Sequence, residues 1–109
     1  MPMVSMEAES ALREIGAQLI TARARRGWSA RELAKRIGVD RRTLAQLEKG
    51  RPTVSVGVFV QALGALDLLR GLEEALKPHN DLEALARDLR RIRSRKSPIR
   101  DIADDQVDF

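Results

Sequence analysis

The sequence contains no cysteine, which excludes disulfide bonds, thiolate catalysis and cysteine-ligated metal sites. It contains one histidine, His79, in a Pro-His-Asn stretch that we expect to be a loop. A single histidine without cysteines cannot assemble the usual zinc-ligand sets. We therefore expect no metal, no other cofactor and a reducing, cytoplasmic environment.

Long apolar runs are also missing. No run approaches the roughly 20 residues that a membrane-spanning helix needs. The first residues, MPMVSMEAESALRE, lack the basic stretch and apolar stretch of a secretory signal. We expect no membrane association and no signal peptide.

Aromatic residues are scarce, at 3% of the chain, whereas hydrophobic residues reach 43%. The core must then be built mainly from Leu, Ala, Ile and Val, which favours an all-α fold over a β-sandwich. The chain has no glycine-rich phosphate loop after a strand and no plausible Ser/His/Asp set. We therefore expect no catalytic residues and a protein that is not an enzyme.

Charge is distributed unevenly along the chain. The net charge is only +4, but residues 23–51 contain ten Lys and Arg against three Asp and Glu, a local balance of +7. The last nine residues contain four aspartates and no base. A local basic block within a modest total charge indicates a surface that faces a polyanion.

Apolar periodicity and capping residues predict six helices. Their expected ranges are 6–26, 30–37, 41–49, 56–66, 68–76 and 82–95. Ser29 with Glu32 forms a capping box, and Asp40, Ser55, Asp67 and Asp81 are the other expected N-caps. We expect a compact domain over residues 1–76, a basic amphipathic helix within 77–96 and a disordered acidic tail over 97–109.

The helices over 30–37 and 41–49 are joined through Gly38 in the manner of a helix-turn-helix. The glycine permits the tight turn, and apolar residues lie on the inner faces of both helices. The second helix is then free to enter a DNA major groove with its N-terminal residues against the base edges.

The outward residues of this second helix are candidates for base contacts, because arginine pairs with guanine and glutamine with adenine. They are Arg41, Arg42, Thr43 and Gln46. Candidates for contacts with the DNA backbone lie at the helix ends. They are Ser29, Ala30, Asp40, Lys49 and Arg51. The alternative interpretation of the two arginines is an ordinary solvated helix face. Trp28, between two helices, is expected to pack in the core rather than stack on a base.

The stretch GWSARELAKRIGVDRRTLAQLEKGRPTVSVGVFVQAL resembles the Cro/Xre-type helix-turn-helix family of bacterial and phage repressors, over about residues 10–69. The resemblance implies a five-helix, lambda-repressor-like domain that binds double-stranded DNA as a homodimer on a palindromic operator. It also implies base contacts from Arg41, Arg42 and Gln46 and an ion pair between Arg23 and Glu48. The alternative for this pair is a weak surface contact. Ala30 departs from the family pattern, which often has a DNA-contacting glutamine there, so only backbone contacts are expected from it.

A second similarity covers about residues 54–76. VSVGVFVQALGALDLLRGLEEAL, followed by a basic helix, is similar to HipB-like antitoxins, which repress their own operon and bind a HipA-like kinase toxin. The similarity implies an antitoxin and autorepressor. The alternative is a stand-alone or phage-type Xre repressor without a toxin partner.

The last predicted helix has an apolar seam of about two heptads. It consists of Leu82, Leu85, Leu89 and Ile92. The seam is either intramolecular core or a surface for a second copy or another partner. The basic run Arg90–Lys96 is a solvated helix end, a nonspecific DNA arm or a patch for an acidic partner.

Overall fold

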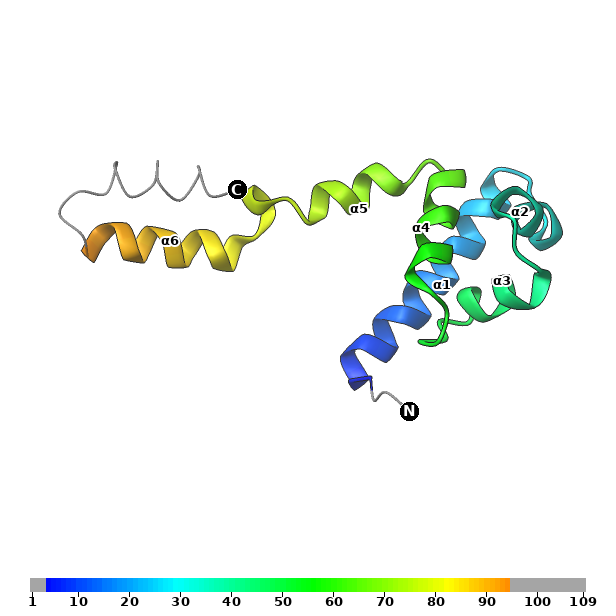
Figure 1. Cartoon of the computed structure of the whole chain (residues 1–109), viewed down its shortest axis with the longest axis horizontal. Coiled ribbons are helices and arrows are strands. Elements are labelled where there is room, and N and C mark those ends of the chain that lie inside the picture. Colours follow the sequence, from blue (N-terminus) through cyan, green and yellow to red (C-terminus); the bar gives the residue numbers. More distant parts are fainter. Residues whose placement is uncertain (1–3, 95–109) are drawn as a thin grey trace. The chain divides into compact units, whose positions relative to one another are not determined.

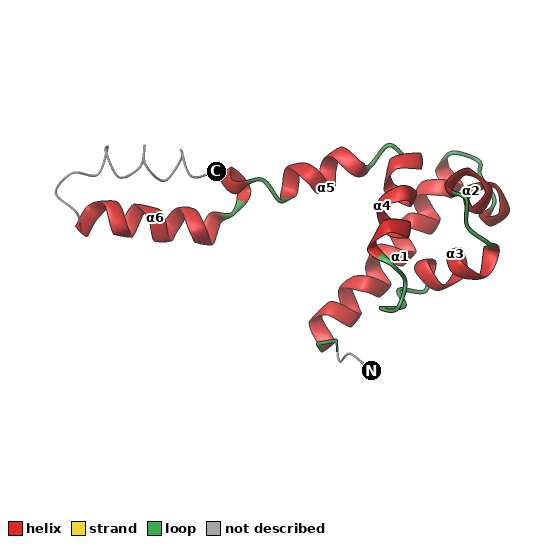
Figure 2. Ribbon diagram, viewed as in Figure 1, coloured by secondary structure: helices red, strands yellow, loops and turns green. Residues whose placement is uncertain are grey.

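The structure is a computed structural model that describes residues 4–94, and every regular element in this range is helical (Figures 1 and 2). The helices are α1 (Met6–Arg25), α2 (Ala30–Ile37), α3 (Arg41–Glu48), α4 (Val56–Ala65), α5 (Leu69–Ala75) and α6 (Leu82–Ser94), with one 3₁₀ turn at Pro78–Asn80. The all-α prediction is confirmed, and the predicted helix ends differ from these by a residue, within the usual uncertainty of such boundaries. The predicted acidic tail over 97–109 lies outside the described residues.

Internal contacts divide the chain into two units, 1–69 and 70–109, which are described separately. In the first unit, α1 packs against α2 and α3, and α2 packs against α3 and α4 (Figure 1). The core is aliphatic, as expected from the scarcity of aromatic residues. Its buried side chains are Leu19, Leu33, Ala34, Ile37, Leu44, Leu47, Ala62, Leu63 and Leu66.

Side-chain caps begin the helices of the helix-turn-helix. The Ser29 hydroxyl accepts the Glu32 N–H at 3.1 Å, and the Glu32 carboxylate accepts the Ser29 N–H, which completes a capping box. Asp40 Oδ1 accepts the Thr43 N–H at 2.7 Å and caps α3. Ser55 caps α4 in the same way. These caps satisfy N–H groups that the helices themselves leave without partners.

Left-handed residues end the helices of the first unit. Gly27, Gly38 and Gly50 have φ near 73°, and each lets the chain turn back after α1, α2 or α3. Asp67, with φ of 60°, has the same role after α4, since the Leu68 N–H reaches the Leu63 carbonyl at 2.8 Å. The expectation that Asp67 caps the fifth helix is therefore wrong. Helix α5 begins only at Leu69, and Asp67 is the one non-glycine residue with positive φ in the part of the chain described.

Two glycines let α1 approach the end of α3 closely. A Cβ atom on Gly16 would overlap the carbonyl oxygen of Glu48. A Cβ atom on Gly50 would lie 2.6 Å from the backbone of Leu12 and Arg13. Backbone therefore packs against backbone here, and this contact fixes the position of the C-terminal end of α3 on α1.

In the second unit, Asp81 caps α6 as predicted, with its carboxylate 3.1 Å from the Ala84 N–H. Leu82 is 76% exposed and Leu89 57% exposed. One face of α6 is thus apolar and open to solvent. None of the helices between residues 4 and 94 combines the length and the apolar character needed to cross a lipid bilayer.

Candidate nucleic-acid interface

Helix α3 is held on the domain by one face only. Leu44 and Leu47 are buried, whereas Arg41 and Arg42 at its start are exposed. Thr43 and Gln46 are half-buried. Among residues 4–94, neither arginine side chain has a hydrogen-bond or ion-pair partner. Two positive charges therefore lie at the first turn of α3 without an ion-pair partner in the described range, although the charge of Arg42 acts on the nearby Asp40.

An ion pair joins α1 to the last residue of α3. Arg23 Nε lies 2.6 Å from Glu48 Oε2, and Arg23 Nη2 lies 3.1 Å from Glu48 Oε1. The side chains are only 16% and 8% exposed. The hydrogen bonds that Arg23 donates to Glu48 raise the pKa of Arg23, against the opposing effect of burial. This two-point contact fixes both the rotation and the position of α3 relative to α1.

Trp28 links the turn after α1 to α2. The Arg36 guanidinium lies over the indole, 3.9 Å from the ring centroid. Arg23 Nη1 also donates to the Trp28 carbonyl at 3.3 Å. Trp28 is half-buried, and its ring has a packing partner within the domain.

The first polar groups of α2 are already engaged in hydrogen bonds within the helix cap. The Ser29 hydroxyl and N–H both lie close to the Glu32 carboxylate, at 3.2 and 3.4 Å. The Ser29 side chain is therefore committed to the cap. Ala30 is half-buried at the first position of α2. Its methyl side chain forms no hydrogen bonds, so it offers only its backbone to a ligand.

Asp40 remains an ionised carboxylate at neutral pH. Hydrogen bonds from the side chain and then the N–H of Thr43, together with the charge of Arg42, lower the pKa of Asp40. Because the carboxylate caps α3, a phosphate in contact with residue 40 would have to approach its main chain.

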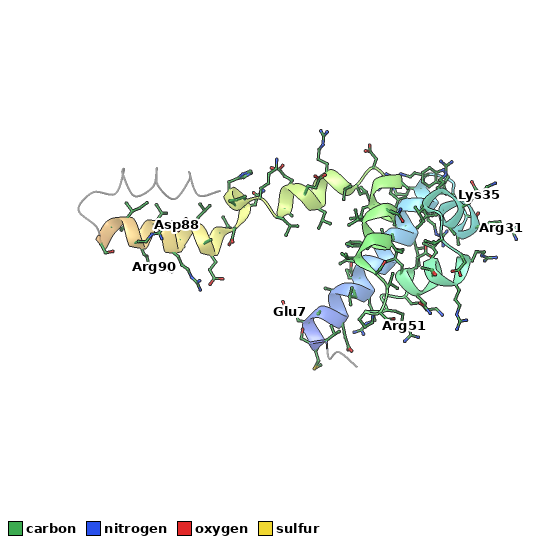
Figure 3. All side chains as sticks on the ribbon, viewed as in Figure 1. Glu7, Arg31, Lys35, Arg51, Asp88 and Arg90 are labelled. Carbon is green, nitrogen blue, oxygen red and sulfur yellow. The ribbon has the colours of Figure 1, made fainter. Side chains whose placement is uncertain are left out.

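Two cations that the sequence analysis did not single out lie on α2. Arg31 and Lys35 are exposed, one helical turn apart, and project away from the domain (Figure 3). Their spacing of four residues, which places them on one helix face, was the available signal. Lys49 and Arg51, at the other end of α3, are also exposed.

The family described as "Helix-turn-helix domain" matches residues 14–76, more than half of the chain. The chain belongs to this helix-turn-helix family. Such domains bind DNA, so the predicted helix-turn-helix and its DNA-binding character are confirmed. The match covers α2 and α3, which form the motif itself.

The match is to the domain family and singles out no member of it. The similarity to HipB-like antitoxins therefore stays a prediction. No curated protein and no solved structure matches the chain.

Proposed function

We propose that this helix-turn-helix protein is a sequence-specific regulator of transcription that uses α3 as its recognition helix. One observation carries the proposal: Arg41 and Arg42 lie exposed and unpaired at the start of a helix whose other end is fixed by Glu48. Fixed orientation matters, because base recognition requires side chains to meet base edges at defined positions.

The chemistry of the outward residues matches base edges in the major groove. Arginine donates two parallel hydrogen bonds to guanine O6 and N7, and glutamine pairs with adenine N6 and N7. Arg41, Arg42 and Gln46 therefore contact bases in the proposed complex, and Thr43 contacts a thymine methyl group or a phosphate. Each good pair contributes about 1–3 kcal/mol of discrimination.

Backbone contacts position the helix in the groove. We assign them to Lys49 and Arg51 after α3, to the start of α2 at Ser29 and Ala30, and to the main chain of Asp40. These contacts carry no sequence information but supply affinity that falls with salt.

Dimerisation supplies the specificity that one helix lacks. A helix as short as α3 reads about four or five base pairs, whereas two copies read two half-sites about one helical turn apart. We propose a homodimer on a palindromic operator, which represses transcription by occluding the promoter.

The apolar seam of α6 is the surface we assign to the second copy. Leu82, Leu85, Leu89 and Ile92 recur at spacings of three, four and three residues. Asp88 and Arg93 flank this seam. Asp88 directly precedes the seam residue Leu89. In a parallel helix pair, a residue at such a position faces the residue five places later on the partner helix, which here is Arg93.

Asp88 of each copy therefore faces Arg93 of the other in a parallel pair, which gives two opposite-charge contacts. An antiparallel pair would instead place Asp88 of one copy near Asp88 of the other, so that like charges meet. The charges of α6 thus favour a parallel, two-fold arrangement of two copies.

A HipA-like kinase toxin is the second candidate partner for the same exposed face, with DNA binding then serving autoregulation. Only the exposed leucines favour it, and they suit a second copy equally well. A toxin-like reading frame next to this gene, whose product co-purifies with the chain, would support this alternative.

Selection of bound sites from random DNA tests the proposed function. Wild type should enrich a two-fold symmetric sequence. Arg42→Ala should lose base preference at one position of each half-site, because the bidentate pair is gone. Arg25 is an exposed arginine at the C-terminal end of α1, and Arg25→Ala should enrich the same DNA sequence as wild type. Enrichment of no sequence, or unchanged affinity after Arg41→Ala with Arg42→Ala, would contradict the proposal.

A further inference from the structure

A hollow of about 290 Å³ lies beside the C-terminal end of α3. It is lined by Glu9 and Arg13 of α1 and by the loop of Lys49, Gly50, Arg51 and Pro52. Three of these six residues are cations and one is an anion. The sequence indicated Lys49 and Arg51 as backbone contacts but gave no reason to include Arg13, which lies more than thirty residues earlier.

The close contact at Gly50 brings these charges together. Since Gly50 has no side chain, its backbone lies directly against that of Leu12 and Arg13. The Gly50 N–H bonds to Leu47 and the Arg51 N–H to Gln46, both at 3.0 Å, so the loop is anchored to α3. Arg13 therefore lines the same hollow as the two loop cations because the backbones are in contact.

The three cations are not neutralised within the domain. In the described range, the side chains of Arg13, Lys49 and Arg51 form no ion pair and no hydrogen bond. Glu9 lies one turn before Arg13 and is exposed, but it does not pair with it. The hollow therefore keeps an excess of two positive charges.

We propose that this hollow binds a phosphate of the operator backbone, and that Arg13 of α1 is a DNA contact together with Lys49 and Arg51. The inference rests on the proposed function and extends its footprint from α3 and its flanks to α1. Arginine and lysine donors around one concavity suit the two non-bridging oxygens of a phosphodiester, which share its negative charge.

The location of the hollow favours DNA over an acidic peptide. Lys49 and Arg51 directly follow the recognition helix, so a duplex that admits α3 into its groove brings a sugar–phosphate strand to the helix end. The carboxylate of Glu9 also lines the hollow and weakens the attraction of any anion there.

Binding of the selected operator at several salt concentrations tests this assignment. Arg13→Gln should lower the salt dependence of the logarithm of the binding constant by about 0.9 per protomer. The corresponding loss of affinity at 0.1 M salt is roughly eight-fold per protomer. The loss should be equal on operator and on unrelated DNA, since a phosphate contact carries no sequence information. Ethylation interference should show at least one operator phosphate whose modification harms wild type but not the variant.

Two control variants separate the site from general electrostatics. Arg25→Gln removes the same charge from the same helix, outside the hollow, and should leave the interference pattern unchanged. Glu9→Gln should act in the opposite direction and tighten binding roughly two- to five-fold, whereas the exposed Glu14→Gln should not.

Equal effects of Arg13→Gln and Arg25→Gln would overturn the site, as would no effect of Arg13→Gln while Arg42→Ala still impairs operator binding. In both cases the proposed function would stand. If Arg42→Ala were also without effect, the proposed function itself would fail.

Discussion

Removal of the Glu48 carboxylate should destabilise the domain next to the proposed DNA-binding surface. Glu48→Ala leaves the guanidinium of Arg23, which is only 16% exposed, without its counter-charge. Breaking a fully buried pair costs about 3–5 kcal/mol, so we expect a loss of about 2–3 kcal/mol in the free energy of unfolding for this nearly buried one. Urea denaturation measures it.

The exposed Glu14→Gln in the same unit is the matched control, since within residues 4–94 the Glu14 carboxylate has one partner, the Gln18 amide at 3.2 Å. A change within about 0.5 kcal/mol is expected there. Similar small losses for both variants would show that the Arg23–Glu48 pair does not stabilise the domain.

Asp40 should make stability depend on pH in the acidic range. Its pKa is lowered in the folded state, mainly by the hydrogen bond with Thr43. A lowered folded-state pKa contributes stability above the unfolded pKa of about 4, and this contribution is lost as pH falls further. Asp40→Asn keeps a capping oxygen without the charge. The stability difference between wild type and this variant should therefore shrink from pH 6 to pH 3 in urea midpoints. A constant difference would contradict the assignment.

The contact between α1 and α3 depends on the absence of a side chain at Gly16. Alanine substitutions at Gly16 and at Gly64 should therefore change the free energy of unfolding in opposite directions. Gly16→Ala forces a methyl group into the Glu48 carbonyl and should cost about 1–3 kcal/mol, as overpacking does. Gly64→Ala lies within α4 with no atom near the added methyl group. It should raise stability by about 0.5–1 kcal/mol, because alanine loses less conformational entropy. Thermal unfolding of the two variants is the measurement, and equal shifts would exclude the close approach.

Much of the element structure could be predicted because its determinants are local. Ser29, Asp40 and Asp81 cap α2, α3 and α6, which begin where their sequences indicate. Gly27, Gly38 and Gly50 follow the ends of α1, α2 and α3. Asp67 was misassigned because aspartate is common at N-caps, whereas it occurs less often in left-handed turns that end helices.

The parts that sequence did not predict are contacts between distant segments. Gly16 resembles any helical glycine until the carbonyl of Glu48 is placed against it. Arg13 joins Lys49 and Arg51 only through the packing of α1 on the loop after α3. Arg31 and Lys35 carried a local signal, their shared helix face, but one that any solvated helix could show.

At the scale of the whole molecule, the proposed parallel pairing of α6 can be tested by exchanging charges. Asp88→Arg and Arg93→Asp each create like-charge contacts across the pair. We expect the dimer dissociation constant to rise roughly three- to ten-fold in each. The double variant restores opposite charges and should return to the wild-type value in sedimentation equilibrium.

Asp88 also pairs with Arg91 of its own helix at 3.3 Å, so each variant needs a measurement of helix content by circular dichroism. Leu89→Glu should abolish the dimer outright. If wild type is a monomer at all concentrations, or if Leu89→Glu dimerises normally, α6 is not the dimer surface.

The exposed start of α3 has a consequence for how such a protein changes over time. Arg41 and Arg42 are exposed and unpaired, whereas Leu44, Leu47 and Glu48 of the same helix hold it in place. Substitutions at the first two positions should therefore leave folding almost unchanged. With the proposed base contacts, new operator preferences become accessible by single mutations without loss of stability, and a library randomised at residues 41 and 42 should consist largely of folded proteins.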